Sequence, residues 1–174
     1  RRQARMRIND FALKLSNVNG TGSASANGLL MQAIFRMGVP VSGKNLFPSN
    51  IQGLPTWYEI RVNGDGHLAR VADFDLFVAM NAETYSADIR EVLSGGYLVY
   101  DSTWPLDRTL LRPDVTFLGV PFARLCGEIF NDSRERILMK NIAYVGTLVA
   151  LLEIDMAVVE KLLAKEREQR YDSA

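Results

Sequence analysis

The stretch NVNGTGSASA, residues 17–26, has the composition of an anion-binding turn, because eight of its ten residues are Gly, Ala, Ser or Asn. It joins a predicted strand to a predicted helix. The backbone amides of such a turn and the positive end of the helix dipole attract anions, and small side chains let a phosphate approach the main chain. We therefore predict that Asn19, Gly20, Thr21, Gly22 and Ser23 bind a phosphorylated ligand, with a tight structural turn as the alternative.

A second candidate is the segment KNLFPSNIQGLPTW, residues 44–57, in which polar and apolar residues alternate. Such a loop can pack on itself and still present hydrogen-bonding groups. It follows the second predicted strand, so it lies near the glycine turn if those strands are neighbours in a parallel sheet. The candidate contacts are Lys44, Ser49, Asn50, Gln52 and Gly53, and an ordered loop without a ligand is the alternative.

Charge favours a local anion site. Residues 11–58 contain no Asp or Glu but include Lys14, Arg36 and Lys44, so we expect a local charge of +3 around the turn. The whole chain has 20 basic and 20 acidic residues and a net charge of +0. It has no overall basic field with which to hold nucleic acid or an anionic membrane.

The glycine pattern does not favour NAD. NAD sites have an acidic residue about 20 residues beyond the glycines, which binds the ribose. Here Lys44 stands near that position, and Ser25 replaces the third glycine of the fingerprint. A lysine suits an additional phosphate, as in NADP or coenzyme A, so a nicotinamide-dependent reductase stays as a minor alternative.

Several kinds of chemistry have no support in the residues. The chain has one cysteine, Cys126, and one histidine, His67, too few for an internal disulfide, a Cys/His zinc site or an iron–sulfur cluster. No paired carboxylates or nucleophile motif are present, so we predict no catalytic residue and no metal ligand. Asn81 and residues 101–103 follow predicted strands, where α/β sheets place ligands, and Asn141 lies inside a predicted helix as a buried contact or a partner-facing group.

The elements that position these residues alternate between strands and helices. Strands are predicted at 11–17, 39–42, 74–80, 97–100 and 115–119, and helices at 23–37, 83–93, 121–130, 136–152 and 156–170. A hairpin is predicted from 56–62 and 67–71 around residues 63–66. Ser23 or Ser25 is the expected N-cap of the first helix, Gly38 its C′ residue, Gly95-Gly96 the end of the second and Asp155 the N-cap of the last.

This pattern predicts an α/β fold with an open, mostly parallel Rossmann-like sheet, flanked by helices and carrying an inserted β-hairpin. We expect one domain over residues 1–174, with a core at about 11–165 and flanking segments at 1–10 and 166–174. No apolar run reaches the roughly 18 residues of a spanning helix, and we expect a cytoplasmic protein.

Several segments together resemble a known family. They are NVNGTGSASAN, GKNLFPSNIQGLPTWYEIRV, DLFVAMN, DST and KNIAYVGTLVALL, in this order along the chain. They resemble the gamma domain of 2-oxoacid:ferredoxin oxidoreductases, in particular alpha-type subunits in which it precedes a pyrimidine-binding domain. Much of that family has GGQG and SPExRGG where this chain has NGTGS and PSNIQG.

The resemblance implies a coenzyme A-binding domain. Such enzymes decarboxylate a 2-oxoacid on thiamine diphosphate, pass electrons through iron–sulfur clusters to ferredoxin, and transfer the acyl group to coenzyme A. It implies that residues 20–23 hold the phosphates of coenzyme A and that residues 49–53 border the route to thiamine. Thiamine diphosphate, magnesium and iron–sulfur clusters would come from other domains or subunits. The partners would be the thiamine-binding alpha and beta domains, and through them ferredoxin, in a hetero-oligomer. The alternative is a stand-alone anion- or nucleotide-binding module of the same fold.

Overall fold

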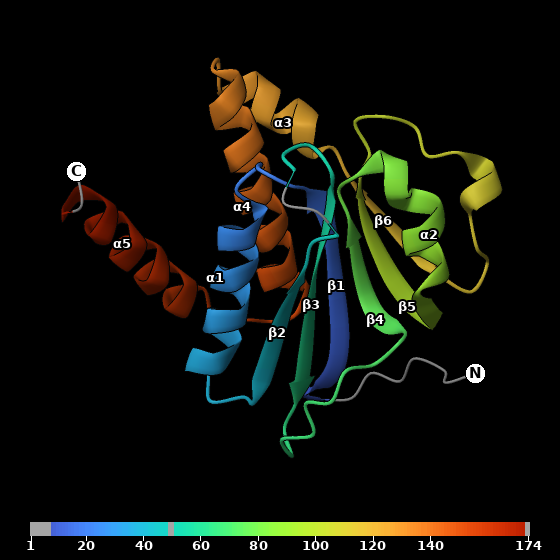
Figure 1. Cartoon of the computed structure of the whole chain (residues 1–174), viewed down its shortest axis with the longest axis horizontal. Helices are drawn as coiled ribbons and strands as arrows, with labels where there is room; N and C mark the ends of the chain where they lie inside the picture. Colours follow the sequence, from blue (N-terminus) through green and yellow to red (C-terminus); the bar gives the residue numbers. More distant parts are fainter. Residues whose placement is uncertain (1–7, 49–50, 173–174) are drawn as a thin grey trace.

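A computed structural model describes residues 8–48 and 51–172, with side chains to residue 165. Six strands form one sheet in the order β2-β3-β1-β4-β5-β6 (Figure 1). The strands are β1 (Asp10–Val18), β2 (Val41–Leu46), β3 (Pro55–Asn63), β4 (Phe74–Ala79), β5 (Val92–Asp101) and β6 (Thr116–Val120). Strand β3 runs antiparallel to both of its neighbours, β2 and β1, and the other five strands run in one direction. The predicted open, mostly parallel α/β sheet is confirmed.

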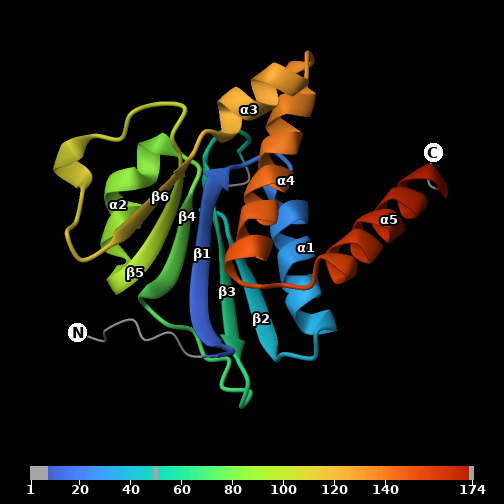
Figure 2. The ribbon, with the colours of Figure 1, turned by 180° about the vertical axis from the view of Figure 1, so that it is seen from behind.

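Helices cover the two faces of the sheet unequally (Figures 1 and 2). On one face lie α1 (Ser23–Arg36) and α4 (Ser133–Leu151), with α3 (Phe122–Ile129) packed on α4 and α5 (Met156–Asp172) on α1. On the other face, the short helix α2 (Tyr85–Arg90) lies over β4 and β5 and follows the 3-10 turn η1 (Ala82–Thr84). The turn η2 (Arg108–Leu110) precedes β6. Among the described helices, none has the length and apolar character needed to cross a bilayer.

Strand β1 is buried on both faces. Leu13 and Leu15 pack with α1 and α4 in the larger core, whereas Ala12 packs with β4, β5 and α2 in the smaller one. The alternation of residues 11–17 correctly predicted a strand, but not that its second face would also be covered. Lys14 and Ser16, on that second face, are only 7% and 1% exposed.

The hairpin forms in a different place from the predicted one. Residues 67–71 form no strand; instead β3 pairs with β2, and residues 47–54 connect them. The predicted strand 39–42 therefore begins later and extends to Leu46, which shortens the predicted loop. It is an edge strand rather than a buried one, because only β3 pairs with it. The segment 67–71 is short and mostly exposed, and it pairs with no strand of the described chain.

Glycine positions explain the remaining differences. The predicted helix 83–93 ends at Arg90, and Gly95-Gly96 lie inside β5 rather than at a helix end. A Cβ on Gly96 would lie 2.9 Å from the Asp75 carbonyl oxygen, so glycine permits the strands to approach here. Gly38 has the expected positive φ of 82° after α1. The N-cap of α1 is Gly22, however, and neither Ser23 nor Ser25.

Candidate functional site

The glycine turn connects the C-terminal end of β1 to the N-terminus of α1. Gly20 and Gly22 have φ angles of 87° and 80°, which residues with a Cβ rarely adopt. Both glycines are exposed, as are Ala24 and Ser25 in the first turn of the helix. That turn contains no acidic residue, and its N-cap supplies no side-chain acceptor. The positive end of the α1 dipole is therefore accessible, which is the arrangement that binds an anion.

The second predicted segment lies against this turn. The Asn19 amide donates to the Leu54 carbonyl at 2.8 Å, and the Gly53 amide donates back to the Asn19 carbonyl at 3.0 Å. The Gln52 side chain covers Gly20 so closely that a Cβ there would lie 2.5 Å from Gln52 Cγ. The structure thus brings Asn19, Gly20, Gln52 and Gly53 together. Ser49 and Asn50 fall outside the described residues.

The loop lies at the turn for a different reason from the predicted one. Strands β1 and β2 are not neighbours, because β3 lies between them. Val18 at the end of β1 is in register with Pro55 at the start of β3. The loop is therefore held at the turn by the antiparallel strand that follows it.

Lys44 lies apart from the glycine turn. It is in register with Glu59, which is in register with Lys14, four residues before the end of β1. At about 3.3 Å per residue, this places Lys44 roughly 13 Å from that end along the strand direction. A Cβ on Gly43 would meet Met31 of α1, so the next side chain, Lys44, projects from the opposite face of the sheet.

The expected local charge of +3 is not present at the turn. Lys14 is buried and bonded to Glu91 at 2.6 Å, with Glu59 at 3.6 Å. Arg36 is in the last turn of α1, about 20 Å along the helix from the glycines. The acidic residues near Lys14 come from other parts of the chain, and the helix N-terminus contributes positive potential at the turn.

Two asparagines, Asn17 of β1 and Asn141 of α4, bond to each other and to the turn. Asn17 Nδ2 donates to Asn141 Oδ1 at 3.1 Å, and Asn141 Nδ2 donates to the Thr21 carbonyl at 2.7 Å. Thr21 Oγ1 donates to the Val18 carbonyl at 2.8 Å. Asn141 is 0% exposed, so it is a buried contact and not a partner-facing group. The only sequence signal for its role was a polar residue within an apolar helix.

Tyr144, one turn further along α4, continues this support. Its hydroxyl donates to Asn27 Oδ1 at 2.7 Å, which joins α4 to the first turns of α1. Burial raises the pKa of Tyr144 well above its ordinary value of 10.0, so the phenol stays protonated and keeps this bond. The turn is thus fixed to α4 by Asn17, which precedes it, and by Asn27, which follows it.

Polar residues after the neighbouring strands have mainly structural roles. Asp101 accepts bonds from the Thr103 hydroxyl at 2.6 Å and from the Ala123 amide at 3.1 Å, so it holds the start of α3. Asn81 Oδ1 accepts from the Glu83 amide at 3.1 Å and begins η1. Asn81 Nδ2 is buried without a partner among the described residues. Within that part of the chain, no three His, Cys, Asp or Glu side chains gather as metal ligands.

The fold and the turn define an α/β domain with an exposed glycine turn and helix N-terminus after its first strand. A family model described as pyruvate ferredoxin/flavodoxin oxidoreductase matches residues 12–173. The chain belongs to this family. The resemblance found in the sequence is therefore confirmed.

Among curated proteins, the chain is similar to subunit alpha of a 2-oxoacid:ferredoxin oxidoreductase from Aeropyrum pernix. The two are 30% identical over 92 residues, which make up 53% of this chain and 14% of that subunit. The chain thus corresponds to a small part of that relative.

Solved structures share the fold. A 2-oxoglutarate:ferredoxin oxidoreductase from Magnetococcus marinus, with 2-oxoglutarate, coenzyme A and succinyl-CoA bound, matches with a TM-score of 0.78 and 21% identity, over 94% of this chain and 28% of that one. Pyruvate oxidoreductase subunit PORC from Thermotoga maritima matches with a TM-score of 0.69 and 19% identity, over 91% and 85%. The gamma subunit of a keto/oxoacid ferredoxin oxidoreductase from Geobacter sulfurreducens matches with 0.65 and 20%, over 89% and 85%.

Proposed function

We propose that this chain is the coenzyme A-binding gamma domain of a thiamine-diphosphate-dependent 2-oxoacid:ferredoxin oxidoreductase. The observation that carries the proposal is the exposed glycine turn at the N-terminus of α1, in a chain that belongs to this family. The whole enzyme would oxidatively decarboxylate a 2-oxoacid and transfer the acyl group to coenzyme A. The structure of the Magnetococcus marinus protein, which has the same fold, was solved with a 2-oxoacid, 2-oxoglutarate, and with coenzyme A and succinyl-CoA bound.

In this proposal the main chain of residues 20–23 binds the pyrophosphate of coenzyme A. The glycines leave the amides accessible, and the helix dipole offsets the ligand's negative charge. Gln52 and Gly53 form the rim beside Gly20 and orient the ligand, while Asn19 fixes that rim to the turn. The 3′-phosphate and the pyrophosphate of coenzyme A are attached to the same ribose, so both would lie close to the turn. Lys44 projects from the opposite face of the sheet, far from the end of β1, and therefore does not contact the 3′-phosphate.

The chain's own residues would bind and orient coenzyme A rather than transform it. Thiamine diphosphate and magnesium would be supplied by other domains. The same holds for iron–sulfur clusters, which a single cysteine cannot ligate. These cofactors supply the decarboxylation and the electron transfer when bound. The proposed partners are the thiamine-binding alpha and beta domains and, through them, ferredoxin.

An apolar surface beside the turn supports a role within a larger assembly. Leu125 and Ile129 on α3 are 43% and 71% exposed, and Ile137 and Leu138 on α4 are 44% and 37% exposed. Leu138 Cδ1 lies 3.3 Å from the position of a Cβ on Gly22, so this surface adjoins the turn. Adjacent exposed apolar side chains are typical of protein interfaces.

Calorimetric titration with coenzyme A tests the proposal, on this chain and on the complete enzyme that contains it. We expect binding of coenzyme A, with similar affinity for 3′-dephospho-coenzyme A, because the structure brings none of Lys14, Arg36 and Lys44 to the turn. NADPH should bind more weakly. Equal binding of NADPH would favour the nucleotide-binding module, and absence of coenzyme A binding to either folded protein would overturn the proposal.

A further inference from the structure

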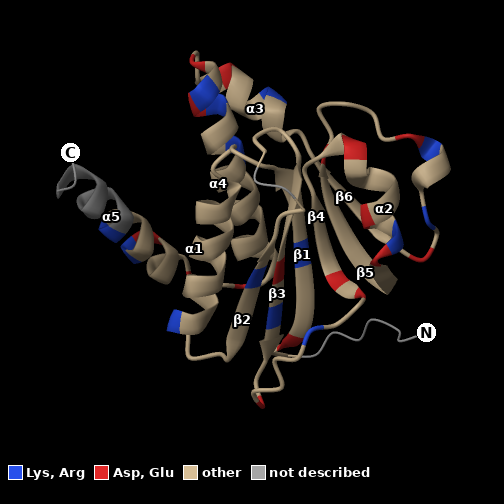
Figure 3. Ribbon diagram, viewed as in Figure 1, with Lys and Arg blue, Asp and Glu red and all other residues tan. Residues whose placement is uncertain are grey.

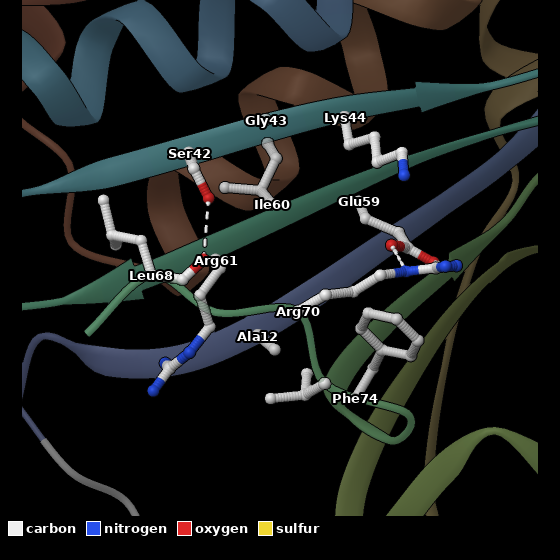
Figure 4. Close-up of a pocket in the computed structure, with 11 residues that line it drawn as sticks. Ala12, Ser42, Gly43, Lys44, Glu59, Ile60, Arg61, Leu68, Arg70 and Phe74 are labelled. Carbon is white, nitrogen blue, oxygen red and sulfur yellow. Dashed lines mark hydrogen bonds and ion pairs between the residues drawn. The ribbon is translucent and has the colours of Figure 1, made fainter.

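A cavity of about 290 Å³ lies on the face of the sheet opposite α1 (Figure 4). It is lined by β2, β3, β1 and the segment between β3 and β4, and its charged or polar lining residues are Ser42, Lys44, Glu59, Arg61 and Arg70. Helix α2 covers this face only over β4 and β5. The cavity is separate from the glycine turn, and its volume is at the small end of the range for ligand pockets.

Among the charged residues that line the cavity, one forms no ion pair within the described part of the chain. Charged residues occur on the neighbouring strands β1, β2 and β3 (Figure 3). Glu59 is paired with Arg70 at 2.7 Å, Lys14 with Glu91 at 2.6 Å, and Arg61 with Asp10 at 2.6 Å. Lys44 is exposed and forms no ion pair within the described part of the chain. One positive charge at this cavity is therefore left without a carboxylate.

Donors converge at one end of the cavity. Figure 4 shows the Lys44 and Arg70 side chains directed toward the same end, beside Glu59. Arg70 bonds Glu59 through Nε and Nη2, at 2.7 and 2.9 Å, and its Nη1 makes no hydrogen bond with the described residues. The Lys44 ammonium and Arg70 Nη1 can thus bond a ligand without breaking the Glu59–Arg70 pair.

Apart from Ser42 and Arg61, the rest of the lining is apolar. Ala12, Leu68, Val71 and Phe74 belong to the apolar part of the lining. Ser42 Oγ donates to the Leu68 carbonyl at 3.4 Å, so this hydroxyl is engaged within the protein. An occupant that matches both regions has one anionic group and an apolar body.

From this cavity we infer a second binding site, which takes a small monocarboxylate with an apolar tail. The carboxylate bonds Lys44 and Arg70, and the tail lies against Val71 and Phe74. A monoanion matches the single uncompensated cation better than a phosphate dianion does. The site is independent of the proposed coenzyme A site, which is built from different residues after the C-terminal end of β1.

Titration with hexanoate, followed through the NMR methyl signals of Leu68 and Val71, tests this inference. We expect a Kd of about 1 mM, weaker binding of acetate and inorganic phosphate, and no saturable binding of hexan-1-ol. Lys44→Gln should weaken hexanoate binding at least about fivefold, because it removes a charged hydrogen bond. Lys161→Gln, an exposed lysine on α5, is the matched control and should bind hexanoate normally.

The inference would be overturned by no hexanoate binding, by shifts confined to other parts of the protein, or by equal binding of the Lys44→Gln variant. Tighter binding of N-acetylglutamate amide than of hexanoate would also overturn it, in favour of an acidic side chain from another polypeptide. Coenzyme A titration of the same variant separates the two sites, because Lys44→Gln should leave coenzyme A affinity unchanged.

Discussion

Asn17 and Asn141 determine the shape of the glycine turn at the scale of single residues. Both side chains are almost completely buried, and each makes hydrogen bonds that tie main-chain groups of the turn to α4. Neither residue offers charge to a ligand. Their contribution to the proposed site is rigidity, because a turn held in one conformation presents its amides without a further entropic cost.

Asn141→Ala should destabilise the protein and loosen the turn. The substitution leaves the Thr21 carbonyl and Asn17 Nδ2 without their partners, at an expected cost of about 2–4 kcal/mol in the free energy of unfolding. Urea denaturation measures this change, and amide hydrogen exchange at residues 20–23 should become faster than in the wild type. Asn131→Ala, at an exposed position, serves as the control. Unchanged exchange at the turn would show that Asn141 does not hold it.

The N-terminus of α1 is the element that supplies positive potential to the proposed site. The helix has 14 residues, begins directly after Gly22, and has no acidic residue in its first turn. An acidic residue there usually stabilises a helix, but it also occupies the potential that an anionic ligand uses. Stability and ligand affinity should therefore respond in opposite directions to a negative charge at this position.

Ser25→Asp tests this separation. Ser25 is exposed in the first turn, so the new carboxylate should raise the free energy of unfolding by about 0.3–1 kcal/mol. Coenzyme A affinity should fall at least about fivefold through charge repulsion. Ser25→Asn has a similar size without the charge and should bind nearly as the wild type does. If both variants bind equally, the ligand does not use the α1 N-terminus.

At the scale of the whole molecule, an ionic network around the buried residues Lys14 and Glu59 connects segments that are distant in sequence. Lys14 of β1 contacts Glu59 of β3 and Glu91 before β5, and Arg70 binds Glu59 with two hydrogen bonds. Burial by itself raises the pKa of Glu59, but the bonds and charges of Arg70 and Lys14 outweigh it and hold that pKa below 4.5. Ionised Glu59 therefore stabilises the fold above about pH 4.5, and this contribution is lost as pH falls through the folded-state pKa.

Glu59→Gln should make stability less dependent on pH in the acidic range. At pH 7 we expect the free energy of unfolding to fall by about 1–3 kcal/mol, because Arg70 and Lys14 lose a charged acceptor. The difference from the wild type should shrink as the pH is lowered through the folded-state pKa, where the wild-type carboxyl is also neutral. Urea denaturation across that pH range measures this, with Glu128→Gln on the exposed part of α3 as the control. A constant difference at all pH values would contradict the assignment.

Local patterns in the sequence determined most of the elements and the glycine turn. The alternation in residues 11–17, the apolar run at 74–80 and the helical spacing after Gly22 depend on short-range periodicity, and the structure has β1, β4 and α1 there. Gly38 ends α1 as predicted, because positive φ is a local property of glycine. The α/β class followed from the order of these elements.

Only the tertiary structure decided which residues meet. Strand order is not encoded locally, so β3 rather than β2 lies beside β1, and this places residues 51–54 on the turn and Lys44 away from it. Lys14 was expected at an anion site, but Glu59 of β3 and Glu91, which precedes β5, neutralise it. Asn141 reaches Thr21 from 120 positions along the chain. Such contacts depend on how the sheet and α4 pack together, which the periodicity of a single segment does not specify.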